Sequence, residues 1–167
     1  MKKTTRKIVF SGVLIALDVI LSRILAINTS VMKIGLGFLA VALCAYFYGP
    51  WWAGACAAIG DIIGSLIFPT GAYFPGFTLT AALTGIVFGL FLKPYSRWRG
   101  VIAAVINVIA VSFFANSYMI SYISDAPYTK LLATRAVQLA VMLPLQGVVL
   151  GVLLPVIAKQ IEKTEKI

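Results

Sequence analysis

This 167-residue sequence has no histidine, only two cysteines and only five acidic residues. Without histidine, no serine or cysteine can form a nucleophile–imidazole pair. The sequence also has no G-x-x-x-x-G-K-[ST] loop, so it cannot hydrolyse ATP in the manner of P-loop proteins. Cys44 and Cys56 lie in different apolar runs, and we expect small core residues there rather than ligands or a disulfide. We therefore expect no enzyme, no metal site and no cofactor.

Polar residues are scarce as well. Hydrophobic residues make up 61% of the chain and the mean hydropathy is +1.01, whereas soluble domains are about 45–50% apolar. Apolar runs recur from residue 8 to residue 158, whereas a cleaved signal peptide shows one short apolar core followed by polar sequence. The composition predicts an integral membrane protein in which residues 1–167 form a single domain.

Six apolar runs are close to the about 17–25 residues that a spanning helix needs. They cover Ile8–Ile27, Ile34–Tyr48, Trp51–Phe68, Thr78–Leu92, Val101–Ile123 and Leu131–Ala158. Because the runs are continuously apolar rather than alternating, they indicate helices and not barrel strands. We predict an all-α membrane protein with six transmembrane helices. The short second and fourth runs either extend into flanks such as Val31–Lys33 and Pro75–Phe77, or cross a locally thinned bilayer.

The basic residues favour one orientation. The net charge is +9, and cytoplasmic loops of membrane proteins carry an excess of Lys and Arg. With the N-terminus inside, the cytoplasmic basic residues are Lys2, Lys3, Arg6, Lys7, Lys93, Arg97, Arg99, Lys159, Lys163 and Lys166, and the external ones are Lys33 and Lys130. We predict a multi-pass plasma-membrane protein with both termini cytoplasmic, whose charge contacts anionic lipid rather than nucleic acid.

Four charged residues interrupt the apolar runs: Asp18, Arg23, Asp61 and Arg135. A charge at the centre of a span costs about 2.5–3.5 kcal/mol or more, so it usually faces protein or a water-filled cavity. At about 1.5 Å per residue, both arginines fall in the outer half and Asp61 comes within reach of a neighbouring arginine. Such a pair could merely tie helices together. Alternatively, the two guanidinium groups lie near the mouth of an outward-facing cavity and favour an anionic ligand.

Uncharged polar residues extend this pattern in the last two runs. Gln138, Met142 and Gln146 follow Arg135 at helical spacing and give one partly polar stripe. The fifth run adds Asn107, Asn116, Ser117 and Tyr118. Together these residues predict a pocket for a polar, flat, negatively charged molecule.

An uncharged loop, Pro69 to Phe77, lies between the third and fourth runs. Its aromatic residues are Tyr73, Phe74 and Phe77. Pro69 and Pro75 restrict the backbone while Gly71 and Gly76 permit sharp turns, which favours a compact segment. One hypothesis is a gate that stacks aromatic rings on the ligand. The other is an aromatic belt that anchors the loop among lipid headgroups.

Three stretches resemble the substrate-binding S component of energy-coupling factor (ECF) vitamin transporters, folate-specific type. They are "LSRILAI", "YGPWWAGACAAIGDIIGSLIFPTGAYFPGFTLTAALTGIVFGLF" and the region from Arg135 to Gln146. The resemblance covers nearly the whole chain, including its length and six-span layout. It implies a bacterial protein that binds one vitamin outside the cell, then docks on a transmembrane coupling (T) protein carrying two ABC ATPase subunits.

The resemblance also implies roles for particular residues. The ligand would be folate or a reduced folate, with its carboxylates on Arg23 and Arg135 and its pterin amino edge on Asp61. Its rings would contact Tyr73, Phe74 and Phe77, and Asn116 and Gln138 would add polar contacts. Related proteins dock through an Ala-x-x-x-Ala pattern in the first helix, for which Gly12 and Ala16 are the nearest equivalent.

Two alternatives stay open at this point. One is an S component for another flat vitamin, such as riboflavin, thiamine or a pyrimidine precursor, although two arginines argue against a cation such as thiamine. The other is a small, self-sufficient secondary transporter. Such a transporter is expected to show inverted repeats with broken helices, and we find no clear internal repeat.

Overall fold

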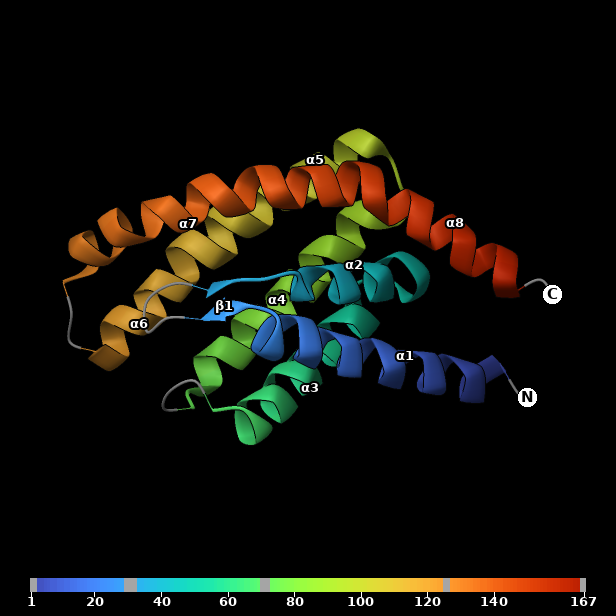
Figure 1. Cartoon of the computed structure of the whole chain (residues 1–167), viewed down its shortest axis with the longest axis horizontal. Helices are drawn as coiled ribbons and strands as arrows, with labels where there is room; N and C mark the ends of the chain where they lie inside the picture. The colour runs from blue at the N-terminus through green and yellow to red at the C-terminus, as the bar shows by residue number, and fades with distance from the viewer. Residues whose placement is uncertain (1–2, 29–32, 70–72, 125–126, 166–167) are drawn as a thin grey trace.

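The computed structural model describes residues 3–28, 33–69, 73–124 and 127–165, and within these ranges the chain forms six helical rods (Figure 1). The first rod is α1 (Lys3–Val19) with the π-helical segment η1 (Ile20–Ile24). Single helices follow: α2 (Gly37–Tyr48), α3 (Pro50–Ile67) and α4 (Pro75–Leu92). The fifth rod joins α5 (Arg97–Ile106), η2 (Asn107–Ala115) and α6 (Asn116–Ser124). The sixth joins α7 (Tyr128–Val148), η3 (Val149–Leu153) and α8 (Leu154–Glu165).

The six rods match the six apolar runs, so the expected all-helical layout is confirmed. By length and composition, four rods could each cross a membrane: Pro50–Ile67, Pro75–Leu92, Arg97–Ile123 and Tyr128–Ile161. The α2 helix is apolar but shorter. The start of α1 and the end of α8 lie at one end of the molecule, while the end of α6 and the start of α7 lie at the other (Figure 1).

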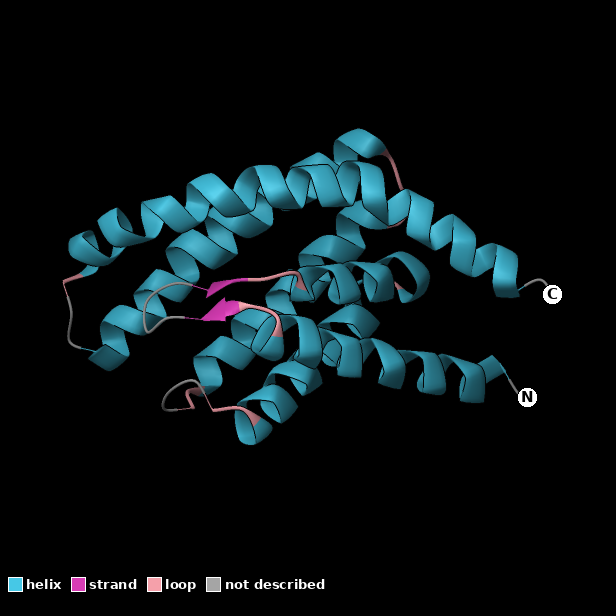
Figure 2. Ribbon diagram, viewed as in Figure 1, coloured by secondary structure: helices cyan, strands magenta, loops and turns pink. Residues whose placement is uncertain are grey.

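The second run does not extend as predicted. Lys33 and Ile34 form strand β2 (Lys33–Ile34), which pairs antiparallel with β1 (Ile27–Asn28), the magenta pair in Figure 2. The last residue expected in the first helix, Ile27, therefore lies in a strand as well. The reason is a close return of the chain: a Cβ added at Gly35 would lie 2.5 Å from Ala26 Cβ. Val31, named in the prediction, lies outside the described residues.

The fourth run does extend as predicted, because α4 begins at Pro75. At two glycines, its contact with α3 leaves no space for a side chain. A Cβ at Gly85 would lie 2.5 Å from Ala53 O, and one at Gly89 would lie 2.1 Å from Pro50 Cα. Small residues let two helix backbones approach closely, which is a common way to pack helices in a membrane.

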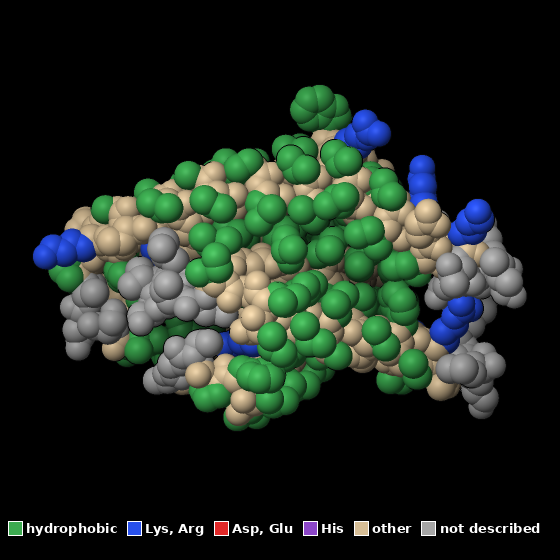
Figure 3. All heavy atoms as spheres, in the orientation of Figure 1, with side chains coloured by type: hydrophobic (Ala, Val, Ile, Leu, Met, Phe, Trp, Pro, Cys, Tyr) green, Lys and Arg blue, Asp and Glu red, His purple; other side chains and the backbone are tan. Residues whose placement is uncertain are grey.

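The surface is largely apolar. Apolar side chains cover the middle of the face in Figure 3, and most of the visible basic side chains lie toward the end that holds the termini. Exposed apolar residues on several rods, for example Val13, Leu66 and Val152, would be unfavourable in water but suit contact with lipid. Cys44 and Cys56 are buried free thiols in the core, as expected.

Candidate ligand-binding site

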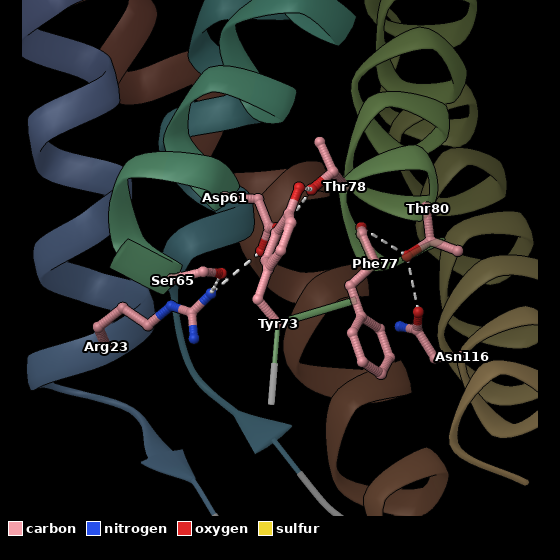
Figure 4. Close-up of polar contacts among 8 residues, drawn as sticks. All are labelled: Arg23, Asp61, Ser65, Tyr73, Phe77, Thr78, Thr80 and Asn116. Carbon is pink, nitrogen blue, oxygen red and sulfur yellow. Dashed lines mark hydrogen bonds and ion pairs between the residues drawn. The ribbon is translucent and has the colours of Figure 1, made fainter. Parts of the chain in front are cut away.

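Arg23, in η1, holds α3 through two side chains. Its Nη2 donates to Asp61 Oδ1 at 3.1 Å and to Ser65 Oγ at 2.8 Å (Figure 4). Both members of the ion pair are largely covered, with side-chain exposures of 8% for Arg23 and 15% for Asp61. Gly64 leaves the space for this arrangement, because a Cβ there would lie 3.0 Å from Arg23 Nε. The expected meeting of Asp61 with a neighbouring arginine is confirmed.

The first turns of α4 connect this pair to the preceding loop. Thr78 Oγ1 donates to Asp61 Oδ2 at 2.9 Å, and Tyr73 OH lies 2.9 Å from Thr78 Oγ1. Figure 4 shows Tyr73 reaching back along Asp61 from the segment before α4. Asp61 therefore accepts from the first rod through one oxygen and from α4 through the other.

The opposite side of α4 faces α6. Thr80 Oγ1 lies 2.7 Å from Asn116 Oδ1 and 2.9 Å from the carbonyl oxygen of Phe77, and its single proton can serve one of these at a time. Thr80 is buried. The next residue after Asn116 along the chain, Ser117, belongs to the second arginine group. The start of α4 thus bridges the two regions in which the sequence places an arginine.

Arg135, in α7, is 3% exposed and has only neutral partners within the described residues. Its Nη1 donates to Ser117 Oγ at 3.0 Å, while Nε and Nη2 both donate to Gln138 Oε1 at 3.2 Å. Ser117 in turn donates to the carbonyl oxygen of Phe113. A buried charge normally has an opposite charge beside it. Within the part of the chain that the structure describes, the guanidinium group is therefore oriented by neutral side chains and has no carboxylate beside it.

A narrow pocket with a cavity volume of about 10 Å³, roughly the space for one water molecule, opens beside this guanidinium group, between the fifth rod and α7. Its lining is apolar apart from three side chains, and it consists of Val108, Ser112, Phe113, Arg135, Gln138, Leu139 and Met142. The expected stripe on α7 is confirmed, because Arg135, Gln138, Met142 and Gln146 are all buried. In the fifth rod, Asn107 donates to Gln146 Oε1 at 3.1 Å, whereas Tyr118 is 62% exposed and does not join this buried group.

Phe74, from the aromatic segment before α4, packs against Tyr122 of α6, whereas Tyr73 is exposed. The ring centroid of Phe74 lies 6.1 Å from that of Phe77 and 6.1 Å from that of Tyr122. Gly76 was expected to permit a turn, but it lies in α4, and its role is close approach: a Cβ there would lie 2.4 Å from Phe74 Cε1. The expected loop is thus shorter than Pro69 to Phe77, since its last three residues are helical. Gly71 lies outside the described residues.

The sequence did not single out three hydroxyl residues of this site: Ser65, Thr78 and Thr80. Ser65 could have been found, since it follows Asp61 by one helical turn on the same face of α3. Thr78 and Thr80 carry no such signal, because a threonine in an apolar helix often bonds only its own backbone. Thr134 does so here, with its Oγ1 3.2 Å from Lys130 O and 3.0 Å from Leu131 O.

The residues expected at a docking surface lie elsewhere, on the outer face of α1. Gly12 and Ala16 are exposed, and a Cβ added at Gly12 would have no atom within 4 Å. This face is therefore open to another helix.

Comparisons with known proteins agree on one family. A family model described as "ECF transporter, substrate-specific component" matches residues 6–163. A folate transporter FolT of Clostridium novyi is 33% identical over 150 residues, which cover 89% of this chain and 87% of the relative. A folate transporter FolT of Leuconostoc mesenteroides is 31% identical over 153 residues, with coverages of 87% and 82%. The crystal structure of FolT bound with folic acid matches with a TM-score of 0.80 at 30% identity, covering 88% of this chain and 90% of that chain.

Proposed function

The chain belongs to the family of substrate-specific components of ECF transporters, and from that premise we propose that it binds folate or a reduced folate. Two relatives that share about a third of its residues are named as folate transporters, and a similar structure holds folic acid. The family is a transport family and not an enzyme family. The lack of an ATP-hydrolysing loop in the sequence agrees with this role.

The observation that carries the choice of ligand is the buried guanidinium group of Arg135. Its described partners are neutral, and it borders a pocket lined mostly by apolar side chains. Folate joins flat aromatic rings to a glutamate with two carboxylates, so it supplies both the missing negative charge and the apolar contact. Arg and carboxylate groups form two parallel hydrogen bonds, which adds geometric selectivity to the charge attraction.

The rest of the molecule would be recognised by the group around α4. Arg23 would share its donors with the second carboxylate. The pterin amino edge, which the sequence-based prediction placed on Asp61, lies at the opposite end of folate and cannot reach Asp61 in the same complex, because Asp61 Oδ1 lies 3.1 Å from Arg23 Nη2. Asp61 would instead orient Arg23 toward the carboxylate. Tyr73, Phe74 and Phe77 would cover the ring system, since aromatic rings stack favourably in offset or edge-to-face arrangements. Asn116 and Gln138 would complete the polar contacts.

For the membrane, we propose that all six rods cross the bacterial plasma membrane with both termini in the cytoplasm. The position of the termini at one end and the basic residues near them support this orientation. The ligand site would then face outward. Transport would require a coupling protein with two ATPase subunits, for which the exposed face around Gly12 and Ala16 of α1 offers a close-packing contact.

The substitution Arg135→Gln tests whether Arg135 binds a carboxylate of folate. This change removes the charge while keeping a polar side chain, and removing one partner of a buried charge pair costs about 2–5 kcal/mol. We expect folate affinity, measured by calorimetry or quenching of intrinsic fluorescence, to fall by at least about thirtyfold. The control is Arg97→Gln, because Arg97 is exposed at the start of α5. Equal affinities of the parent and Arg135→Gln would refute the anion site, and tighter binding of riboflavin or thiamine than of folate would refute the ligand.

A further inference from the structure

We propose that Thr78 is a positioning residue that couples the segment carrying Tyr73 to the Arg23–Asp61 ion pair, so that a ligand carboxylate on Arg23 fastens this segment over the site. The inference rests on the proposed function for the identity of the ligand. The contacts that carry it join four side chains (Figure 4).

The donors and acceptors of these hydrogen bonds can be assigned. Thr78 Oγ1 donates its one proton to Asp61 Oδ2, so it can only accept from Tyr73, whose hydroxyl lies 2.9 Å away. Tyr73 must therefore be the donor. Arg23 donates to the other carboxylate oxygen. Every hydrogen bond in this relay points toward Asp61, which fixes one arrangement of all four groups around a single negative charge.

Tyr73 is held in place through Thr78. Tyr73 is 48% exposed, and within the described part of the chain its hydroxyl bonds only Thr78. Thr78, in contrast, lies in the first turns of α4, which packs tightly on α3 through glycines. Thr78 is therefore the fixed point through which a partly exposed aromatic side chain is attached to the ion pair.

Ligand binding at Arg23 should strengthen the attachment of Tyr73. Asp61 is neutralised by Arg23 through one oxygen and receives a neutral donor through the other. When a ligand carboxylate also accepts from Arg23, Arg23 compensates less of the negative charge of Asp61. A hydrogen bond to a less compensated carboxylate is stronger, so the hydrogen bond from Thr78 to Asp61 strengthens. A stronger bond at Thr78 holds Tyr73 more firmly. Binding of the anion at one end of the relay thus slows the departure of the ring that covers it.

The decisive variants remove one hydroxyl each. Thr78→Val keeps the shape of the side chain, Tyr73→Phe keeps the ring, and Thr78→Ser keeps the hydroxyl. We expect Thr78→Val and Tyr73→Phe each to raise the dissociation rate of folate by about tenfold, as measured by stopped-flow fluorescence, with little change in the association rate. The double variant should dissociate no faster than Thr78→Val alone, because Tyr73 acts through Thr78. Thr78→Ser should behave like the parent.

Thr134→Val and Tyr118→Phe are the matched controls. Each removes the same hydroxyl from an exposed residue outside the relay, so each should leave the dissociation rate unchanged. Effects of Tyr73→Phe and Thr78→Val that simply add would overturn the coupling, as would a Thr78→Ser variant as fast as Thr78→Val.

A readout without ligand separates this inference from the proposed function. Hydrogen exchange of the peptide from Tyr73 to Thr78 in the ligand-free protein should be faster in Thr78→Val than in the parent and in Thr78→Ser. If the parent fails to bind folate, the proposed function is wrong, and this exchange comparison still decides whether the relay exists. Equal exchange in all three proteins would overturn the relay even if folate binds.

Discussion

Gly64 packs against Arg23, so adding even a small side chain at Gly64 should alter the candidate ligand site. A Cβ at this residue would lie 3.0 Å from Arg23 Nε and 3.3 Å from Arg23 Cγ, whereas ordinary contacts begin at 3.4 Å. Alanine therefore requires a shift of 0.4 Å, the difference between 3.4 and 3.0 Å, which a flexible arginine can make. Valine adds two more carbons, each about 1.5 Å further out, so it should displace the guanidinium group.

The displaced guanidinium group would lose its contacts with Asp61 and Ser65, at 3.1 and 2.8 Å. Hydrogen bonds that involve a charged group contribute about 1.5–3 kcal/mol each. If Arg23 binds a ligand carboxylate in this position, Gly64→Val should weaken folate binding by about ten- to a hundredfold, while Gly64→Ala should weaken it by less than about threefold. The contrast between the two variants is the prediction, because both add apolar volume to the same helix face.

Equilibrium titration of folate into purified protein measures this contrast, and thermal unfolding confirms that each variant is folded. Gly147→Val is the matched control, since a Cβ there would have no atom within 4 Å, and it should bind folate like the parent. Parental affinity in Gly64→Val, or a loss in Gly64→Ala as large as that in Gly64→Val, would show that the position of Arg23 does not determine folate binding.

Two more predictions concern packing and transport. Gly89→Ala should lower the midpoint of thermal unfolding by several degrees at least, because its Cβ would lie 2.1 Å from the backbone of Pro50, which cannot move aside as a side chain can; a midpoint equal to that of the parent would contradict the contact. Gly12→Leu combined with Ala16→Leu should abolish ATP-driven folate uptake by the assembled transporter and leave folate affinity of the isolated subunit intact; loss of binding with normal assembly would reject the docking surface.

The helical layout followed from the sequence because each span is a continuous apolar run, which is a strong signal in lipid. The paired strands β1 and β2 did not, since two residues per strand form no pattern. Their place is set by the close contact of Gly35 with Ala26. Similarly, the sequence indicated turn chemistry for Gly76, although its structural role is to let Phe74 lie against α4.

At the site, the charged residues could be predicted and their connections could not. Arg23, Asp61 and Arg135 could be identified because a charged residue in an apolar run is energetically unfavourable and usually has a structural or functional role. Thr78 could not be identified, because its role depends on the two side chains, Tyr73 and Asp61, that folding places next to it. Thr84 shows the difficulty: its hydroxyl lies 3.1 Å from Thr80 O of its own helix and 2.8 Å from Asn107 Oδ1 of another rod, and its single proton can serve one of these at a time. Composition alone does not tell such cross-helix contacts from local ones.

The π-helical segment η1 follows α1, whose exposed face holds Gly12 and Ala16, and Arg23 lies near the end of η1. In an α-helix each residue turns the chain by about 100°, and a π-helical turn accommodates one residue more than an α-helical turn. The extra residue of η1 is therefore taken up within one turn, and Arg23 keeps about the direction that it would have in an α-helix one residue shorter. Deleting one of residues 20–22 would let this turn become α-helical with little rotation of Arg23, whereas inserting one would rotate Arg23 by about 100° relative to the face with Gly12 and Ala16. The angle between the proposed docking face and the proposed ligand contact should therefore tolerate a deletion in this segment better than an insertion.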